Sequence, residues 1–249
     1  MNDILSPSPN VLMNLMDDVT KLLIQSQLAR MLLCFGSLAR GTWDCWSDLD
    51  LIVVTDHRSQ FVEILDRLGK ARSIVHRNHF VAQVEPSGGH VLGILFQGSS
   101  VFHCLDLNLL TYQDYKREGS LERFGIIKEL YHSSADDIVT GQSQLEVPSE
   151  QEDPDEARIT WGIHFTKKAA KKVLRGEKSL DDLLRYSTAL RQVMTEYPAN
   201  LVIRGRQVGY LAHTYLAIAD LVLNTQGKNK DLAGKPLLTS HPQIGRLFS

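Results

Sequence analysis

The stretch from Cys34 to Val54 constrains this chain more than any other, because it joins two apolar runs through a glycine turn and a pair of acids. The first run, residues 31–35, leads directly into Gly36-Ser37, and the second run carries Asp48 and Asp50. Side chains alternate between the two faces of a strand, so we expect the two acids to project together. Crowded carboxylates repel each other unless a cation lies between them, and a hard divalent ion with oxygen ligands is the natural candidate.

The residues that follow the first apolar run have the chemistry that binds phosphate. Gly36 lets the backbone approach a ligand closely. Ser37 offers a hydroxyl and an amide N–H, and Arg40 offers a planar fork of donors. Phosphate-binding groups beside metal ligands predict chemistry on a nucleotide; the alternative is a glycine turn before an ordinary strand with solvated carboxylates. Two aromatic residues nearby, Trp43 and Trp46, either stack on a base or an acceptor or simply cover the loop.

The order Gly36-Ser-Leu-Ala-Arg-Gly41 and then Ser47-Asp-Leu-Asp50 resembles the signature of the polymerase-beta-like nucleotidyltransferase superfamily. The Ala-Arg-Gly continuation is most similar to minimal nucleotidyltransferases and to aminoglycoside and lincosamide adenylyltransferases. The resemblance implies an α/β (α+β) fold, in which a mixed sheet flanked by helices precedes a C-terminal helical bundle. It also implies a third carboxylate on a strand next to the one with the acid pair, and Asp106 matches by position. Otherwise Asp106 is a capped or salt-bridged aspartate at a strand end.

The resemblance implies transfer of a nucleoside monophosphate, AMP from ATP, to a hydroxyl with release of pyrophosphate. The implied catalytic and metal-binding residues are Asp48, Asp50 and Asp106, which would hold two Mg²⁺ ions. The general base stays open. Asp106 could take the proton, the metal could lower the pKa of the hydroxyl enough to need little help, or Glu85 could act near the acceptor.

The nucleotide-binding residues that the resemblance implies are Gly36, Ser37 and Arg40, with Lys172 as a further candidate. Lys172 belongs to residues 161–176, which resemble the first helix after the catalytic domain of antibiotic adenylyltransferases. A run of lysines on a helix is otherwise a solvated face.

Composition limits the partners and the location. The chain has 249 residues and a net charge of −2, which argues against nucleic acid as a partner because no global basic field is present. No apolar run approaches the ~20 residues of a membrane span, and the first residues lack the pattern of a signal peptide. Three cysteines without a metal-type spacing indicate reduced thiols and a cytoplasmic protein. We expect Cys34 and Cys104 to behave as small core residues.

A polar segment divides the chain into two predicted domains. We predict a catalytic domain at 1–140, a linker at 141–155 rich in Gly, Ser, Gln, Pro and acids, and a helical substrate-binding domain at 156–249. Apolar spacing predicts helices at 7–30 and at 59–68, strands at 31–35, 73–76, 80–84, 91–96 and 101–107, and helical faces that include Trp161, Phe165, Ala169 and Val173.

We expect a small hydroxylated acceptor that is held on the helical side of a cleft, with aminoglycoside and lincosamide antibiotics as candidates. The rival hypothesis is an antitoxin-type minimal nucleotidyltransferase that adenylylates or masks a partner protein. One chain with both a catalytic and a helical part argues against the need for such a partner. The base of the nucleotide and a homodimeric state stay open.

Overall fold

The computed structural model describes residues 9–72, 74–81, 90–97, 99–100, 102–117, 119–133, 154–198, 201–202 and 208–228. These residues belong to two compact units, one within Pro7–Ser149 and the other within Glu150–Ser249. The division falls inside the predicted linker at 141–155, although residues 141–153 lie outside the described part of the chain. The domain limits at 140 and 156 therefore stay a prediction, and each unit is considered by itself below.

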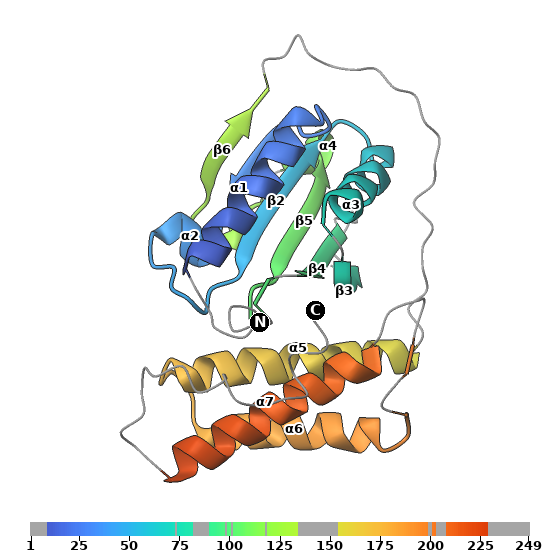
Figure 1. The fold of residues 1–249 in the computed structure, drawn as a ribbon. Helices are drawn as coiled ribbons and strands as arrows, with labels where there is room; N and C mark the ends of the chain where they lie inside the picture. The colour runs from blue at the N-terminus through green and yellow to red at the C-terminus, as the bar shows by residue number, and fades with distance from the viewer. Residues whose placement is uncertain are drawn as a thin grey trace. The chain divides into compact units, whose positions relative to one another are not determined.

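The first unit is a six-stranded mixed sheet in the order β3-β4-β5-β2-β1-β6 (Figure 1). Its strands are β1 (Met31–Cys34), β2 (Leu49–Thr55), β3 (Ile74–Val81), β4 (His90–Phe96), β5 (Leu105–Thr111) and β6 (Lys128–His132). Its helices are α1 (Pro9–Gln25), α2 (Gly36–Arg40), α3 (Ser59–Ala71), α4 (Tyr112–Tyr115) and the 3-10 helix η1 (Glu122–Phe124). β2 and β5 are parallel, and the other neighbouring strands are antiparallel. The α/β class with a mixed sheet is confirmed.

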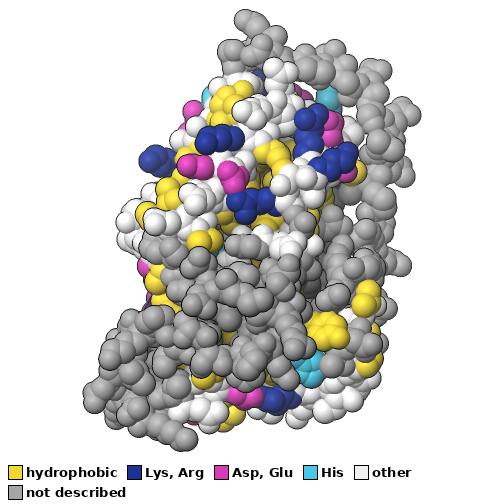
Figure 2. All heavy atoms as spheres, in the orientation of Figure 1, with side chains coloured by type: hydrophobic (Ala, Val, Ile, Leu, Met, Phe, Trp, Pro, Cys, Tyr) yellow, Lys and Arg dark blue, Asp and Glu magenta, His cyan; other side chains and the backbone are white. Residues whose placement is uncertain are grey.

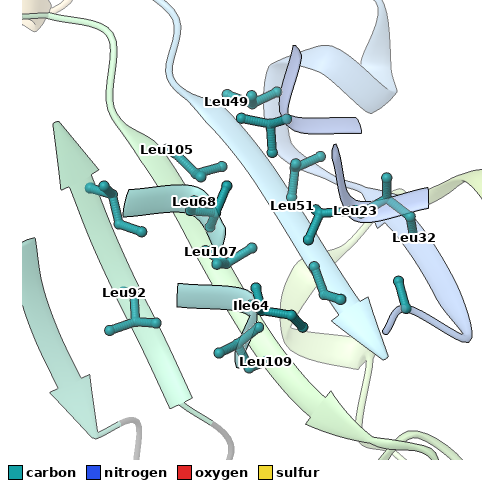
Figure 3. Packing of buried hydrophobic residues seen from close by; sticks show 14 of the residues in the cluster. Leu23, Leu32, Leu49, Leu51, Ile64, Leu68, Leu92, Leu105, Leu107 and Leu109 are labelled. Atoms are coloured by element: carbon teal, nitrogen blue, oxygen red, sulfur yellow. The ribbon is translucent and has the colours of Figure 1, made fainter. Parts of the chain in front are cut away.

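Alternate side chains of β2 and β5 project from opposite faces of this sheet. Leu51 and Leu107 point into the main core, where they pack with residues of α1 and α3 (Figure 3). Ile52 and Val54 point the other way, into a smaller cluster with Phe124. Because Asp50 and Asp106 alternate with the leucines of the main core, both acids project from the face of the smaller cluster. We call this the carboxylate face.

Several element boundaries differ from the sequence prediction. One strand, β3, replaces the two short pieces predicted at 73–76 and 80–84, and β5 begins at Leu105 rather than at residue 101. The helix predicted at 59–68 continues through Gly69 to Ala71 in α3. A single glycine costs a helix only about 1 kcal/mol, and Lys70 forms an ion pair with Asp66 one turn earlier.

The second unit is a bundle of helices α5 (Pro154–Leu174), α6 (Leu180–Met194) and α7 (Val208–Lys228). The predicted helical face with Trp161, Phe165, Ala169 and Val173 lies on α5. Ala169 and Val173 of this face are buried, whereas Trp161 and Phe165 are 43% and 36% exposed. Their rings instead stack on each other, and Phe165 stacks on Tyr186 of α6. The buried face of α5 contains Ile163 and Ala170. No helix in the described part of the chain combines the length and the hydropathy that a bilayer crossing requires.

The cysteines give a test of this fold. Cys34 and Cys104 are buried, whereas Cys45 is only half-buried. Burial raises the pKa of the Cys34 thiol, and the nearby charge of Lys128 offsets this only in part. The thiolate is the reactive form. We therefore expect iodoacetamide to modify Cys45 first in the folded protein at pH 8, as measured by peptide mass spectrometry. Equal labelling of all three thiols without denaturant would contradict the core placement.

Candidate active site

The pairing of β2 with β5 brings two acids together. Asp50 lies directly opposite Asp106 in the parallel register, and both are the second residue of their strands. Neighbouring strands lie about 4.8 Å apart, and register partners share a face. The two carboxylates therefore project side by side, each half-buried. Like charges so placed favour a bound cation or a shared proton.

Asp48 takes a different position from the one that strand alternation predicts. β2 begins at Leu49, so Asp48 precedes the strand rather than lying within it. Its Oδ1 accepts a hydrogen bond from the backbone N–H of Cys104 at 3.0 Å. The N–H of Leu49 in turn donates to the carbonyl of Cys104 at 2.8 Å. The Asp48 carboxylate thus adds one hydrogen bond to the β2–β5 pairing, just before the first paired residues of the two strands.

Gly36 provides the close approach that the sequence indicates. It begins α2, one residue after Phe35, and has φ +66, in the left-handed region that favours glycine. A Cβ atom at this position would lie 2.1 Å from Oδ2 of Asp50, so the Gly36 backbone lies directly against this carboxylate. The preceding N–H, that of Phe35, donates to the carbonyl of Asp50 at 3.2 Å. The predicted phosphate-binding turn at Gly36 therefore lies in contact with Asp50 of the acid pair.

The other residues of the predicted turn belong to α2. Ser37 is half-buried, and Arg40 is exposed near the end of this short helix. Gly41 ends α2 in the left-handed conformation, with its N–H bonded to the carbonyl of Leu38. Their assignment to phosphate binding stays a prediction. Lys172, on α5, belongs to the second unit and is half-buried, whereas the neighbouring Lys171 is buried. Its role also stays a prediction, and Glu85 lies outside the described residues.

Hydrogen bonds that sequence reasoning did not anticipate hold the loop before β2. The Ser47 hydroxyl accepts from the N–H of Asp44 and donates to its carboxylate, both at 2.9 Å. His103, fully buried, places Nε2 2.9 Å from the carbonyl of Cys45. Trp46 packs edge-on against Phe102, which favours the loop-covering interpretation of this tryptophan. The signal for the Ser47 role was its place within the Ser-Asp-x-Asp motif.

A hollow of about 580 Å³ lies elsewhere on this unit, between α1 and α3. Lys and Arg side chains gather over these helices with acids between them (Figure 2). Two of these ion pairs lie within α3, Arg67–Glu63 and Lys70–Asp66, and a third joins Arg72, directly after α3, to Asp18 of α1. The hollow is on the face opposite the carboxylates, since α1 and α3 cover the main core. It is therefore not the site that holds the reacting groups.

The donor set fits a magnesium ion that takes some of its ligands from the protein and the others from a nucleotide. Among the described residues, no group of three or more His, Cys, Asp or Glu side chains is arranged to hold a metal ion. Asp50 and Asp106 thus provide two carboxylate ligands rather than a complete set of protein ligands for a metal ion. Mg²⁺ is characteristically bound by one or two carboxylates together with substrate phosphates and water. The Gly36 backbone lies directly beside Asp50 of that pair.

A glycine turn that lies against paired acids on a mixed sheet defines a candidate nucleotide-processing site. The family described as "Nucleotidyltransferase domain" matches residues 21–87, a segment that contains β1, α2 and β2. This match supports assignment of the domain to the polymerase-beta-like nucleotidyltransferases, and it supports transferase activity. Asp106 lies beyond the matched segment. Comparison with curated proteins gives no significant match.

Substitution of the two glycines by alanine separates backbone strain from contact with the acid. Gly36→Ala and Gly41→Ala both place a side chain at positive φ, +66 and +69. Such strain costs of order 1–2 kcal/mol. Only at residue 36 does the new Cβ meet Asp50, since nothing lies within 4 Å of it at residue 41. We expect Gly36→Ala to lower the free energy of unfolding by more than Gly41→Ala, as measured in urea. Equal losses would contradict the contact.

Two substitutions of Asp48 separate its hydrogen bond from its charge. Asp48→Asn keeps an oxygen that can accept from Cys104, whereas Asp48→Ala removes it. A hydrogen bond to a buried donor contributes about 1–2 kcal/mol. We expect Asp48→Ala to lose about this much unfolding free energy and Asp48→Asn to lose less, by urea denaturation. The hydrogen bond has no structural role if both variants unfold at the parental midpoint.

Proposed function

We propose that this protein transfers AMP from ATP to a hydroxyl of a small molecule in a Mg²⁺-dependent reaction. The observation that carries the proposal is the register of Asp50 with Asp106, next to the Gly36 backbone. The match of residues 21–87 supports nucleotidyl transfer in general. The metal, the nucleotide and the acceptor are parts of the proposal.

In the proposed reaction, Asp50 and Asp106 hold Mg²⁺, with Asp48 as the further carboxylate. When bound, the metal neutralises charge on the phosphate oxygens and lowers the pKa of the acceptor hydroxyl. The amides around Gly36 and the Ser37 hydroxyl orient the β- and γ-phosphates, and Arg40 adds a positive charge. This orientation places the leaving oxygen opposite the acceptor, so that part of the barrier is removed by positioning.

The bond changes follow from in-line displacement. The acceptor oxygen forms a bond to the α-phosphorus while the bond from that phosphorus to the β-bridging oxygen breaks. Pyrophosphate leaves with the bonding electron pair. The acceptor proton passes to the Asp106 carboxylate in this proposal, because Asp106 lies in the carboxylate pair.

The acceptor class rests on the similarity of the Ala-Arg-Gly continuation to antibiotic adenylyltransferases. We propose aminoglycosides or lincosamides as acceptors and a role in antibiotic resistance. The test is incubation of the purified protein with Mg²⁺, ATP labelled at the α-phosphate and a panel of these drugs. Label that appears in a drug supports the acceptor class. Label that appears only in a protein band supports the rival partner-modifying activity, and no labelled product with any acceptor contradicts the transferase proposal.

Replacement of one acid by its amide tests the carboxylate pair directly. Asp50→Asn keeps the shape of the side chain and removes the charge. We expect AMP transfer to fall by about 10²-fold or more, the size of loss seen when one electrostatic stabiliser of a transition state is removed. Chelation of divalent ions with EDTA should abolish the parental activity in the same assay.

The matched control is Glu63→Gln, which makes the same chemical change on the exposed face of α3, where Glu63 pairs with Arg67. We expect this variant to keep the parental rate of transfer. If Asp50→Asn transfers AMP at the rate of Glu63→Gln, the metal-binding assignment of Asp50 is wrong.

A further inference from the structure

A cation on the carboxylate face has no role in the reaction described so far. It is Arg123 of η1, the short helix that precedes β6. β6 begins at Lys128, which pairs with Cys34 at the end of β1. η1 therefore approaches the end of the sheet where β1 leads into Gly36.

Two ring contacts and a backbone hydrogen bond connect Arg123 to the backbone of Asp50. Phe35 follows β1 and donates its N–H to the carbonyl of Asp50. The rings of Phe35 and Phe124 meet edge-on with centroids 4.8 Å apart. The guanidinium carbon of Arg123 lies 4.5 Å from the centroid of the Phe124 ring. Both phenylalanines belong to the smaller cluster, so this series of contacts lies on the face from which Asp50 projects.

The electrostatic setting of Arg123 suits an anionic ligand. No carboxylate of the described residues forms an ion pair with it, in contrast to Arg30, which pairs with Asp56. The side chain of Arg123 is exposed, so its guanidinium is accessible to a ligand, and an arginine stays charged at neutral pH. The guanidinium fork also matches the oxygens of phosphate.

We propose that Arg123 binds the β- and γ-phosphates of the nucleotide, with the Phe124 ring holding its guanidinium in place. This inference rests on the proposed function, because it requires a nucleoside triphosphate at the acid pair. The triphosphate then lies between the start of α2 and η1, with Ser37 on one side and Arg123 on the other. The sequence offered no motif at Arg123, since only the fold brings residues 122–124 to the end of β1.

The test compares Arg123→Gln with Arg117→Gln, an equivalent change at an exposed arginine that precedes η1. A fluorescent ATP analogue is titrated in the presence of Mg²⁺, and its displacement by ATP, inorganic pyrophosphate and AMP is measured. We expect Arg123→Gln to weaken ATP and pyrophosphate about tenfold or more, as loss of a charge-assisted hydrogen bond would. AMP lacks the β- and γ-phosphates and should keep its parental affinity. Arg117→Gln should leave all three affinities at parental values.

The outcomes separate this inference from the proposed function. Unchanged ATP affinity in Arg123→Gln, in a preparation whose parental protein transfers AMP, overturns the role of Arg123 alone. An equal loss for ATP and AMP overturns it too, because that result assigns Arg123 to general stability of the site. A parental protein that binds no nucleotide overturns both proposals.

A second variant covers the case in which Arg123→Gln is unstable. Arg123→Met keeps a long apolar stem against Phe124 and removes the charge. It should show the same selective loss of ATP and pyrophosphate affinity. Parental ATP affinity in a folded Arg123→Met protein, checked by circular dichroism, overturns the inference.

Discussion

The parallel pairing of β2 with β5 is the contact on which the rest of the candidate site depends. It sets Asp50 beside Asp106, and it continues through the Asp48 carboxylate to the backbone of Cys104. It also directs alternate leucines into the main core. A shift of one residue in this register would turn the acids into that core and the leucines outward. The stability of the core and the position of the charges are therefore set by the same hydrogen bonds.

Much of this arrangement could be predicted from local sequence. The strand–glycine–strand pattern at 31–55 needs only short-range rules, and the place of Asp106 followed from an acid in an apolar strand together with the superfamily resemblance. The register of Asp50 with Asp106 could not be read from either strand alone. The place of Asp48 outside β2 depends on a contact with Cys104, which lies on the loop before β5. The alternation of side chains along a strand cannot predict a hydrogen bond to a residue as distant in sequence as Cys104.

The helical face predicted on α5 shows a similar limit. Ala169 and Val173 of this face are buried, whereas the rings of Trp161 and Phe165 stack on each other and Phe165 stacks on Tyr186. Periodicity identifies which residues share a face, but not which part of that face is buried. Likewise, the meeting of Phe35 with Phe124 depends on β6 pairing at the edge of the sheet. The sequence predicted no strand in that segment.

The distance along the chain between β2 and β5 also bears on synthesis by the ribosome. A nascent chain that has exposed only residues up to α3 contains the glycine turn and Asp50, but not the strand that completes the acid pair. Non-local pairing of this kind forms slowly compared with local helices. The two carboxylates therefore come together only after Thr111 has emerged, and a chain truncated before β5 cannot possess the pair.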